Sequence, residues 1–304
     1  MNKIPVTFLA GHSPRKGVIG IPAKPIGDRD TEYLSKMFTF DGAAWGVVQK
    51  EFDFAPKAIS YLTSDGGNYK AWWLVGRNGE TIEVRKGVPA FGQIPGAGTR
   101  NVAPIYGYIE NIKCIDNELY ACGGGRQVYR LEGGKWRSLS DEILTEKRGF
   151  GFFDIDGTSS TDLYAVGFKG EIWHFDGSWR LDDAPTSNIL TSVRAVGAQD
   201  VWVCGNNRTL LHGSFNQWDS IVSAGSDRNF YCVERFMDKT YVAANRSLAV
   251  VAGDEVVPVD MKLGKAVSTH RLHGRDGLLW SIGEEDLVRF DGVRWLEFVH
   301  PDNA

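Results

Sequence analysis

The sequence has no long apolar run and no excess of basic residues. Its longest apolar candidates, such as residues 247–253, have the length of a strand, whereas a membrane-spanning helix needs about 20 residues. The 38 acidic residues outnumber the 34 basic ones, so the formal net charge is -4. General nucleic-acid and anionic-membrane binders carry the opposite balance. We therefore expect no membrane partner and no nucleic-acid partner, and any electrostatic function must be local.

Cysteine is scarce, and export signals are missing from the sequence. The four cysteines, Cys114, Cys122, Cys204 and Cys232, form no C-x-x-C pair and have neither zinc-site nor disulfide-framework spacing. The short apolar stretch after Lys3 runs into HSPRKG without a small-x-small cleavage pattern. These features predict reduced thiols and a cytoplasmic location.

The common catalytic motifs are also missing. The sequence contains no HExxH, GxSxG or P-loop, and GGGR at 123–126 lies between two expected strands rather than before a helix. We therefore predict no enzyme activity, no cofactor and no metal.

What the sequence does contain is an internal repeat. Strand-like segments that end in glycine or asparagine recur along the chain, and each is followed by a turn, a second strand, a Gly/Asp-rich turn and often a tryptophan strand. These segments are AWWLVG (71–76), LYACGG (119–124), LYAVG (163–167), VWVCG (201–205), TYVAAN (240–245) and LWSIG (279–283).

The repeat length predicts the architecture. The equivalent positions, from Gly76 to Gly283, are 38 to 47 residues apart, which matches a four-stranded propeller blade. MFTFDGAAW near the N-terminus adds a partial seventh unit, and 304 residues shared among seven blades gives about 43 each. We predict one all-β domain, a seven-bladed propeller of four-stranded antiparallel blades, that spans residues 1–304. The expected blades are 4–54, 57–86, 109–140, 152–183, 191–222, 229–260 and 267–299.

The sequence leaves the closure of the ring open. The stretch from Ile4 to Ile21 lacks a clear repeat, and RWLEF at 294–298 ends the last unit. Either the N-terminal residues build blade one, which we favour, or one strand crosses between the termini.

Two segments carry a family resemblance. DLYAVGFKGEIWHFDGSWR (162–180) and DVWVCGNNRTLLHGSFNQW (200–218) resemble the WD40-like or YVTN-like propeller repeats of bacteria. The resemblance covers most of the chain and implies the fold, but propellers host many functions. Small propellers of this kind are similar to immunity proteins that neutralise toxins of interbacterial competition.

The repeat gives a structural interpretation to most of the candidate catalytic and metal-binding residues. His174 and His212 occupy one repeat position in a third strand, where we expect a hydrogen bond to a nearby turn. Cys122 and Cys204 replace small core residues before the repeat glycine. Turn geometry accounts for two sets of aspartates. They are Asp41, Asp176, Asp254 and Asp291, and Asp116, Asp162, Asp200, Asp238 and Asp276.

One series of turns suggests a binding surface. Strand alternation places the turns between second and third strands on one face of the disc, together with the connections between blades. These turns carry one cation in each of five blades, and Glu284 and Glu285 break the series in the last. The cations are Arg77, Arg126, Lys169, Arg208 and Arg246.

Two insertions are expected on the same face. The first is 87–108, rich in Gly and Pro, with Phe91 and Tyr106; the second is 140–152, with Arg148 and Phe150. Arginine and aromatic residues together are typical of protein-binding hot spots. We predict that these four residues and the five cations bind a protein with an acidic surface.

Three classes of function remain. We favour a non-catalytic, monomeric protein-binding module, with a cytoplasmic toxin inhibitor as the best example. The second is an enzyme or sugar-binding propeller in which Asp154, Asp156, Thr269 and His270 converge in the central pocket. The third is an assembly or maturation scaffold.

Overall fold

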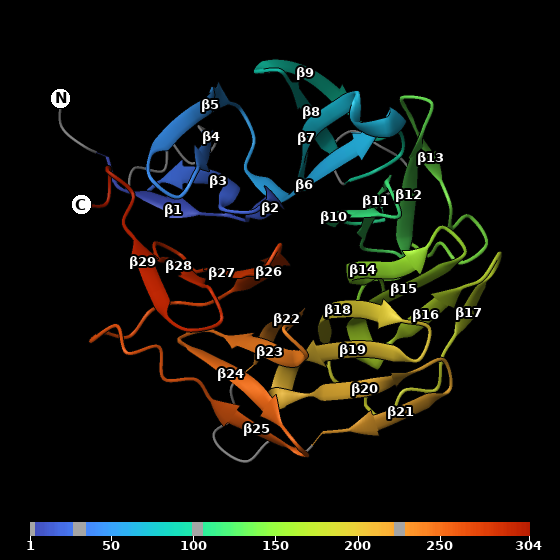
Figure 1. The fold of residues 1–304 in the computed structure, drawn as a ribbon. Helices are drawn as coiled ribbons and strands as arrows, with labels where there is room; N and C mark the ends of the chain where they lie inside the picture. The colour runs from blue at the N-terminus through green and yellow to red at the C-terminus, as the bar shows by residue number, and fades with distance from the viewer. Residues whose placement is uncertain (1–3, 27–34, 99–105, 222–228) are drawn as a thin grey trace.

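The chain is an all-β, seven-bladed propeller. The computed structural model describes residues 4–26, 35–98, 106–221 and 229–304, which form seven antiparallel sheets around a central axis (Figure 1). This confirms the predicted fold class. Residues 27–34 of the first expected blade and 99–105 of the first expected insertion lie outside the described residues.

The strands follow the chain blade by blade, from the inner strand outward. Blade 1 holds β1 (Val6–Phe8), β2 (His12–Arg15), β3 (Val18–Pro25), β4 (Ser35–Phe40) and β5 (Trp45–Phe52). Blade 2 holds β6 (Pro56–Ser64), β7 (Tyr69–Gly76), β8 (Glu80–Arg85) and β9 (Val88–Gln93). Blade 3 holds β10 (Ile109–Ile115), β11 (Glu118–Gly123), β12 (Gln127–Glu132) and β13 (Lys135–Ser138). Blade 4 holds β14 (Phe152–Ser159), β15 (Asp162–Gly167), β16 (Ile172–Phe175) and β17 (Trp179–Leu181).

The last three blades repeat the same order. Blade 5 holds β18 (Leu190–Gly197), β19 (Asp200–Gly205), β20 (Leu210–Ser214) and β21 (Gln217–Ser220). Blade 6 holds β22 (Phe230–Phe236), β23 (Lys239–Ala244), β24 (Ser247–Ala252) and β25 (Glu255–Pro258). Blade 7 holds β26 (Arg271–Arg275), β27 (Leu278–Ile282), β28 (Leu287–Phe290) and β29 (Trp295–Phe298).

Blade 1 has five strands rather than the expected four. Both β1 and β2 pair with β3, so two short strands share the inner position. Between them the chain passes close to blade 7, where a Cβ atom at Gly11 would lie 3.0 Å from Cγ1 of Ile282. This close approach coincides with the break in the inner strand.

The ring closes by packing between complete blades. Blade 1 comes from the N-terminal residues and blade 7 from the C-terminal ones, and the two share no strand. The side chain of Asn303 accepts a hydrogen bond from the backbone N–H of Val6 (2.7 Å) and donates one to its carbonyl (2.9 Å). The buried ring of His300 contacts Phe38 and Trp45 of blade 1. The segment after β29 therefore fastens the last blade to the first.

The repeat glycine is required by the close approach of two backbones. A Cβ atom at Gly205 would lie 2.2 Å from the carbonyl oxygen of Ile189, and one at Gly167 would lie 1.8 Å from that of Gly151. The φ of Gly205 is -171°, an extended value that any residue adopts. The lack of a side chain, and not conformational freedom, is therefore what this position needs.

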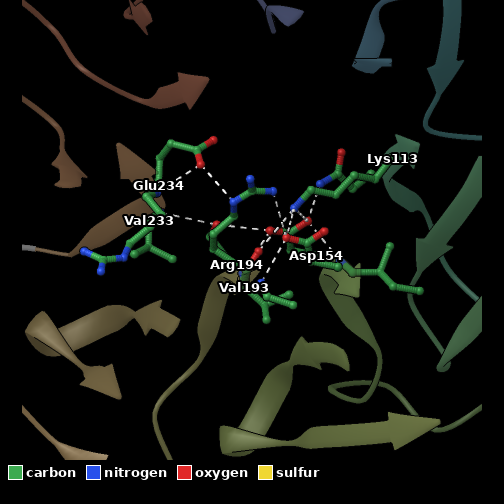
Figure 2. A network of polar contacts seen from close by, with 12 residues as sticks. Lys113, Asp154, Val193, Arg194, Val233 and Glu234 are labelled. Atoms are coloured by element: carbon green, nitrogen blue, oxygen red, sulfur yellow. Dashed lines mark hydrogen bonds and ion pairs between the residues drawn. The ribbon is translucent and has the colours of Figure 1, made fainter. Parts of the chain in front are cut away.

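Polar side chains join the blades around the central channel. The inner strands of neighbouring blades share no backbone ladder, so side chains of one strand accept hydrogen bonds from the next. The carboxylate of Asp154 on β14 accepts from the amide of Asn111 on β10 (2.6 Å) and from the backbone N–H of Val193 on β18 (2.9 Å). One buried carboxylate thus connects three blades (Figure 2).

A second layer, two residues further along each strand, extends the network with ion pairs. Asp156 lies 3.3 Å from both Lys113 and Arg194, and Arg194 lies 2.9 Å from Glu234. Glu234 accepts from the backbone N–H of Gly274 in blade 7 (3.3 Å). Burial raises the pKa of Glu234, and Arg194 and Lys113 oppose that rise. Buried charges are tolerated because each finds an opposite charge and a hydrogen-bond donor.

Two histidines share this channel in neutral form. The rings of His12 on β2 and His273 on β26 lie 4.2 Å apart. Burial, followed by the charges of Arg275 and Lys113, lowers the pKa of His12 to about 3. Burial also lowers the pKa of His273 well below its ordinary value.

The repeat glycine gives a direct test of blade packing. We expect Gly205→Ala to lower the free energy of unfolding by on the order of 3 kcal/mol, because the new methyl group must displace the backbone at Ile189. Gly197→Ala, in the same blade, is the control, since the nearest atom to its Cβ is 4.0 Å away. Urea unfolding of both variants measures the difference, and equal stabilities would contradict the explanation.

Acid sensitivity tests the neutral histidines. Between the unfolded pKa of about 6.5 and the folded pKa of about 3, the unfolded chain binds a proton at His12 that the folded chain does not. Stability is therefore lost as the pH falls through this window. In His12→Gln the dependence of unfolding free energy on pH between about 6 and 4 should be shallower by about 1.4 kcal/mol per pH unit. Parallel curves for variant and wild type would contradict this.

Candidate partner-binding face

The five cations of the predicted binding surface lie on one face of the disc. Each stands in the turn between the second and third strands of its blade, and the antiparallel order brings these turns to the same side. We call this side the connection face, defined by turns 77–79, 124–126, 168–171, 206–209, 245–246 and 283–286. The opposite side, with the other two turns of each blade, is the hairpin face.

The five cations differ in how available they are. Arg77, Lys169 and Arg246 are exposed. Arg126 is paired instead, because its guanidinium donates two hydrogen bonds, of 3.0 and 2.6 Å, to the carboxylate of Glu171. The guanidinium of Arg208 lies over the ring of Phe230, 5.2 Å from its centroid. The surface charge available to a partner therefore comes mainly from three positions.

Phe150 gathers two of the cations into one cluster. Its ring lies 4.9 Å from the guanidinium of Arg126 and 3.8 Å from the ammonium of Lys169. The backbone N–H of Gly125 donates to the carbonyl of Phe150 (2.9 Å), which ties the insertion to the turn that carries Arg126. The structure therefore brings these three predicted residues together.

The other predicted residues are more scattered. Tyr106 is partly buried against the turn at Gly125. A Cβ atom placed on Gly125 would lie 2.7 Å from the Cβ atom of Tyr106. Arg148 is exposed in the second insertion. Phe91 is exposed but lies on β9, the outermost strand of blade 2.

The first insertion is shorter than the sequence indicated. Residues 88–93 pair with β8 as the fourth strand of blade 2, with Ile82 opposite Phe91. The expectation that all of 87–108 is an insertion was therefore wrong, because Gly87, Pro89 and Gly92 suggested a connection and not an edge strand. Phe91 lies on the rim of the disc.

The central channel opens on the connection face as a funnel of about 660 Å³. Five inner strands carry a β-bulge where they enter it. A bulge redirects a side chain out of the ordinary strand alternation. The bulged residues line the funnel and are Lys57, Glu110, Phe153, Thr191 and Tyr231.

Sequence reasoning missed these residues. Each is the second residue of the first strand of its blade, next to the residue that pairs with the repeat position. They share no chemistry, since the set contains a cation, an anion, two aromatic rings and a hydroxyl group. Their variation within a repeating apolar strand was the available signal.

The residues of the ligand-binding alternative do not converge. Asp154 and Asp156 belong to the buried network between blades, and the hydroxyl of Thr269 donates to the carbonyl of Ser247 (2.8 Å). Only His270 lines the funnel, where its Nε2 lies 2.8 Å from the side-chain oxygen of Asn245. The side chains of Asp154, Asp156 and Thr269 thus stabilise the ring.

The remaining histidines and cysteines have structural partners or surroundings. His174 bonds to Asp162 (2.8 Å) and His212 to Asp200 (3.0 Å), which confirms the expected contact with a nearby turn. Burial raises the pKa of Cys204 well above its ordinary value. In the described ranges, no three His, Cys, Asp or Glu side chains are grouped to hold a metal ion. No helix in these ranges is long and apolar enough to span a membrane.

One known protein is similar in sequence to most of this chain. No family model matches the chain. The immune protein Tsi7 of Pseudomonas aeruginosa is 29% identical over 261 residues, which cover 84% of this chain and 85% of Tsi7.

Solved structures show the same fold in distant proteins. The WD40 β-propeller domain of Doa1 has a TM-score of 0.69 at 10% identity and covers 94% of this chain and 92% of its own. YCF48 bound to a D1 peptide has a TM-score of 0.66 at 15% identity, with coverage of 99% and 94%. The chain is a β-propeller protein homologous to the immune protein Tsi7.

Proposed function

We propose that this chain is a cytoplasmic immunity protein that neutralises a toxin by binding it on the connection face. The observation that carries the proposal is the similarity to an immune protein along 84% of the chain. The extent of the match is important because 261 residues are far more than one repeat. The neutralisation is by stoichiometric binding and not by catalysis.

The charge and shape of the connection face support an acidic protein partner. Arg77, Lys169 and Arg246 are exposed there, and such charges accelerate association with an oppositely charged surface. The backbone at Arg126, Lys169 and Arg208 has φ of 63°, 58° and 58°. Non-glycine residues rarely adopt this region without a functional or structural reason. Long cationic side chains at turns that favour glycine are consistent with selection for a binding surface.

The cysteines support the proposed compartment. None of the four is paired, and three are buried in the blades. A chain with free thiols and no disulfide fits a reducing cytoplasm.

The function is tested by neutralisation and not by capture alone. The tagged chain is used to isolate a stoichiometric partner from native cells, and that partner is then expressed by itself in a second host. We expect it to stop growth, and co-expression of this chain to restore growth. A partner that is harmless without the chain, or that stays toxic with it, would contradict the proposal.

The face is tested by charge reversal with a matched control. The triple variant Arg77→Glu, Lys169→Glu, Arg246→Glu should slow association with the toxin by on the order of tenfold or more, because it removes electrostatic attraction. The control, Lys86→Glu, Lys135→Glu, Lys239→Glu, changes the net charge equally at exposed positions of the hairpin face. Association rates at two salt concentrations measure both. Equal slowing by the two variants would mean that only the overall charge matters.

A further inference from the structure

The funnel on the connection face is a built feature of the ring. A β-bulge recurs at the same position in five consecutive blades, and the bulged side chain lines the funnel each time. A single bulge could be a local irregularity, but five at one level place five side chains around one opening. Bulges of this kind are typically kept where a side chain must be re-aimed.

The lining of the funnel combines aromatic rings with charged and polar side chains. Phe153 packs on Phe168 with ring centroids 4.7 Å apart, and Tyr231 lies against His270 at 5.5 Å. Lys57 and Glu110 neutralise each other across neighbouring blades at 2.7 Å. Concave sites in which aromatic walls surround placed polar groups are typical of specific binding sites.

One charge in the lining stands apart from these pairs. Arg271, at the start of β26, is partly buried where the funnel narrows into the channel. Its side chain lines both the funnel and the part of the channel below it. Among the described residues, no carboxylate oxygen lies within 4.0 Å of its guanidinium, whereas Arg126 and Arg194 are both ion-paired. Glu284 also lines the funnel but is exposed to solvent.

We propose that the funnel receives a projecting loop of the toxin, and that an aspartate or glutamate of this loop pairs with Arg271. This inference rests on the proposed function and adds the central contact to it. A protein that covers the connection face would remove water from Arg271, and a buried guanidinium without a partner is costly. The carboxylate must therefore come from the occupant, while Glu284 can keep its water at the edge of the funnel.

A protein loop fits this site better than a free small anion. The funnel adjoins a second hollow of about 470 Å³, between blades 1 and 2, which Arg77 borders. An occupant anchored at Arg271 would thus continue across the face toward an exposed cation of the predicted binding surface. The aromatic rings of Phe153 and Tyr231 supply contact area beside the charge, as in protein hot spots.

Substitution at the two ends of one strand tests the proposal. Arg271→Gln should weaken binding of the purified toxin by roughly thirtyfold or more, mostly through faster dissociation, because the loop's carboxylate loses its partner. Arg271→Lys should retain part of the affinity because it keeps the charge without the two-pronged geometry. Arg275→Gln is the matched control, since Arg275 is exposed at the other end of β26, on the hairpin face.

A cross-linking experiment identifies the occupant. Tyr231 is replaced by the photoreactive benzoylphenylalanine, and the toxin peptide that becomes attached is sequenced. The peptide should contain Asp or Glu, whose replacement by Lys should weaken binding to the wild-type chain and restore binding to Arg271→Glu. Thermal melting of each variant confirms that the ring remains folded.

The outcomes separate this inference from the proposed function. If the toxin binds and is neutralised while Arg271→Gln binds as tightly as wild type, or if no toxin peptide attaches at Tyr231, the funnel proposal is wrong and the immunity function stands. If no toxin is neutralised by the wild-type chain, the proposed function fails first.

Discussion

Neighbouring blades of this ring share no backbone ladder. The rest of the structure therefore depends on the side-chain hydrogen bonds that join one blade to the next. Around the channel, side chains of one inner strand accept hydrogen bonds from backbone N–H groups of the next. Asp154 bridges blades 3, 4 and 5, and Glu234 continues the series to blade 7. A carboxylate that satisfies an otherwise unpaired N–H offsets its own desolvation. The inner strands are thereby held at fixed positions.

Because these contacts between blades occupy the channel side chains, only other residues are available to bind a partner protein. Ion pairs and neutral histidines line the part of the channel below the funnel, so the charged side chains there already have partners within the ring. The level above it, at the bulges, carries side chains that vary from blade to blade. Residues that are alike in every blade build the ring. Residues that differ between blades and line the funnel are available to a partner protein. Asp154 and Asp156, two candidates of the sugar-binding alternative, belong to this lower part of the channel, where they already hold neighbouring blades together.

The sequence predicted the ring because its determinants are local. The glycine of VWVCG and its counterparts Gly123, Gly167 and Gly283 mark the place where two backbones touch, and the spacing of the repeat counts the blades. The series of turn cations could be placed on one face for the same reason, since strand alternation fixes the side of each turn. The pairing of Arg126 with Glu171 could not be foreseen, because it depends on the relative twist of two blades.

The edge strand and the funnel were harder to predict for different physical reasons. Residues 88–93 contain Pro89 and Gly92, which are tolerated on an edge strand but suggest a loop in a sequence. The bulges change the direction of a side chain without changing the residue pattern. Thr191 and Tyr231 have the side chains of ordinary strand residues. Their variation between blades is visible in the sequence, but the direction in which they point follows only from the register.

The central claim is that the connection face, with the funnel at its centre, is the surface that meets the toxin. Hydrogen exchange of the chain with and without the purified toxin tests it most directly. We expect slower exchange at the turns that carry Arg77, Lys169 and Arg246 and at the start of β26, with the hairpin turns at 116–117 and 237–238 unchanged. Protection confined to those hairpin turns, or to β9 on the rim, would contradict the account.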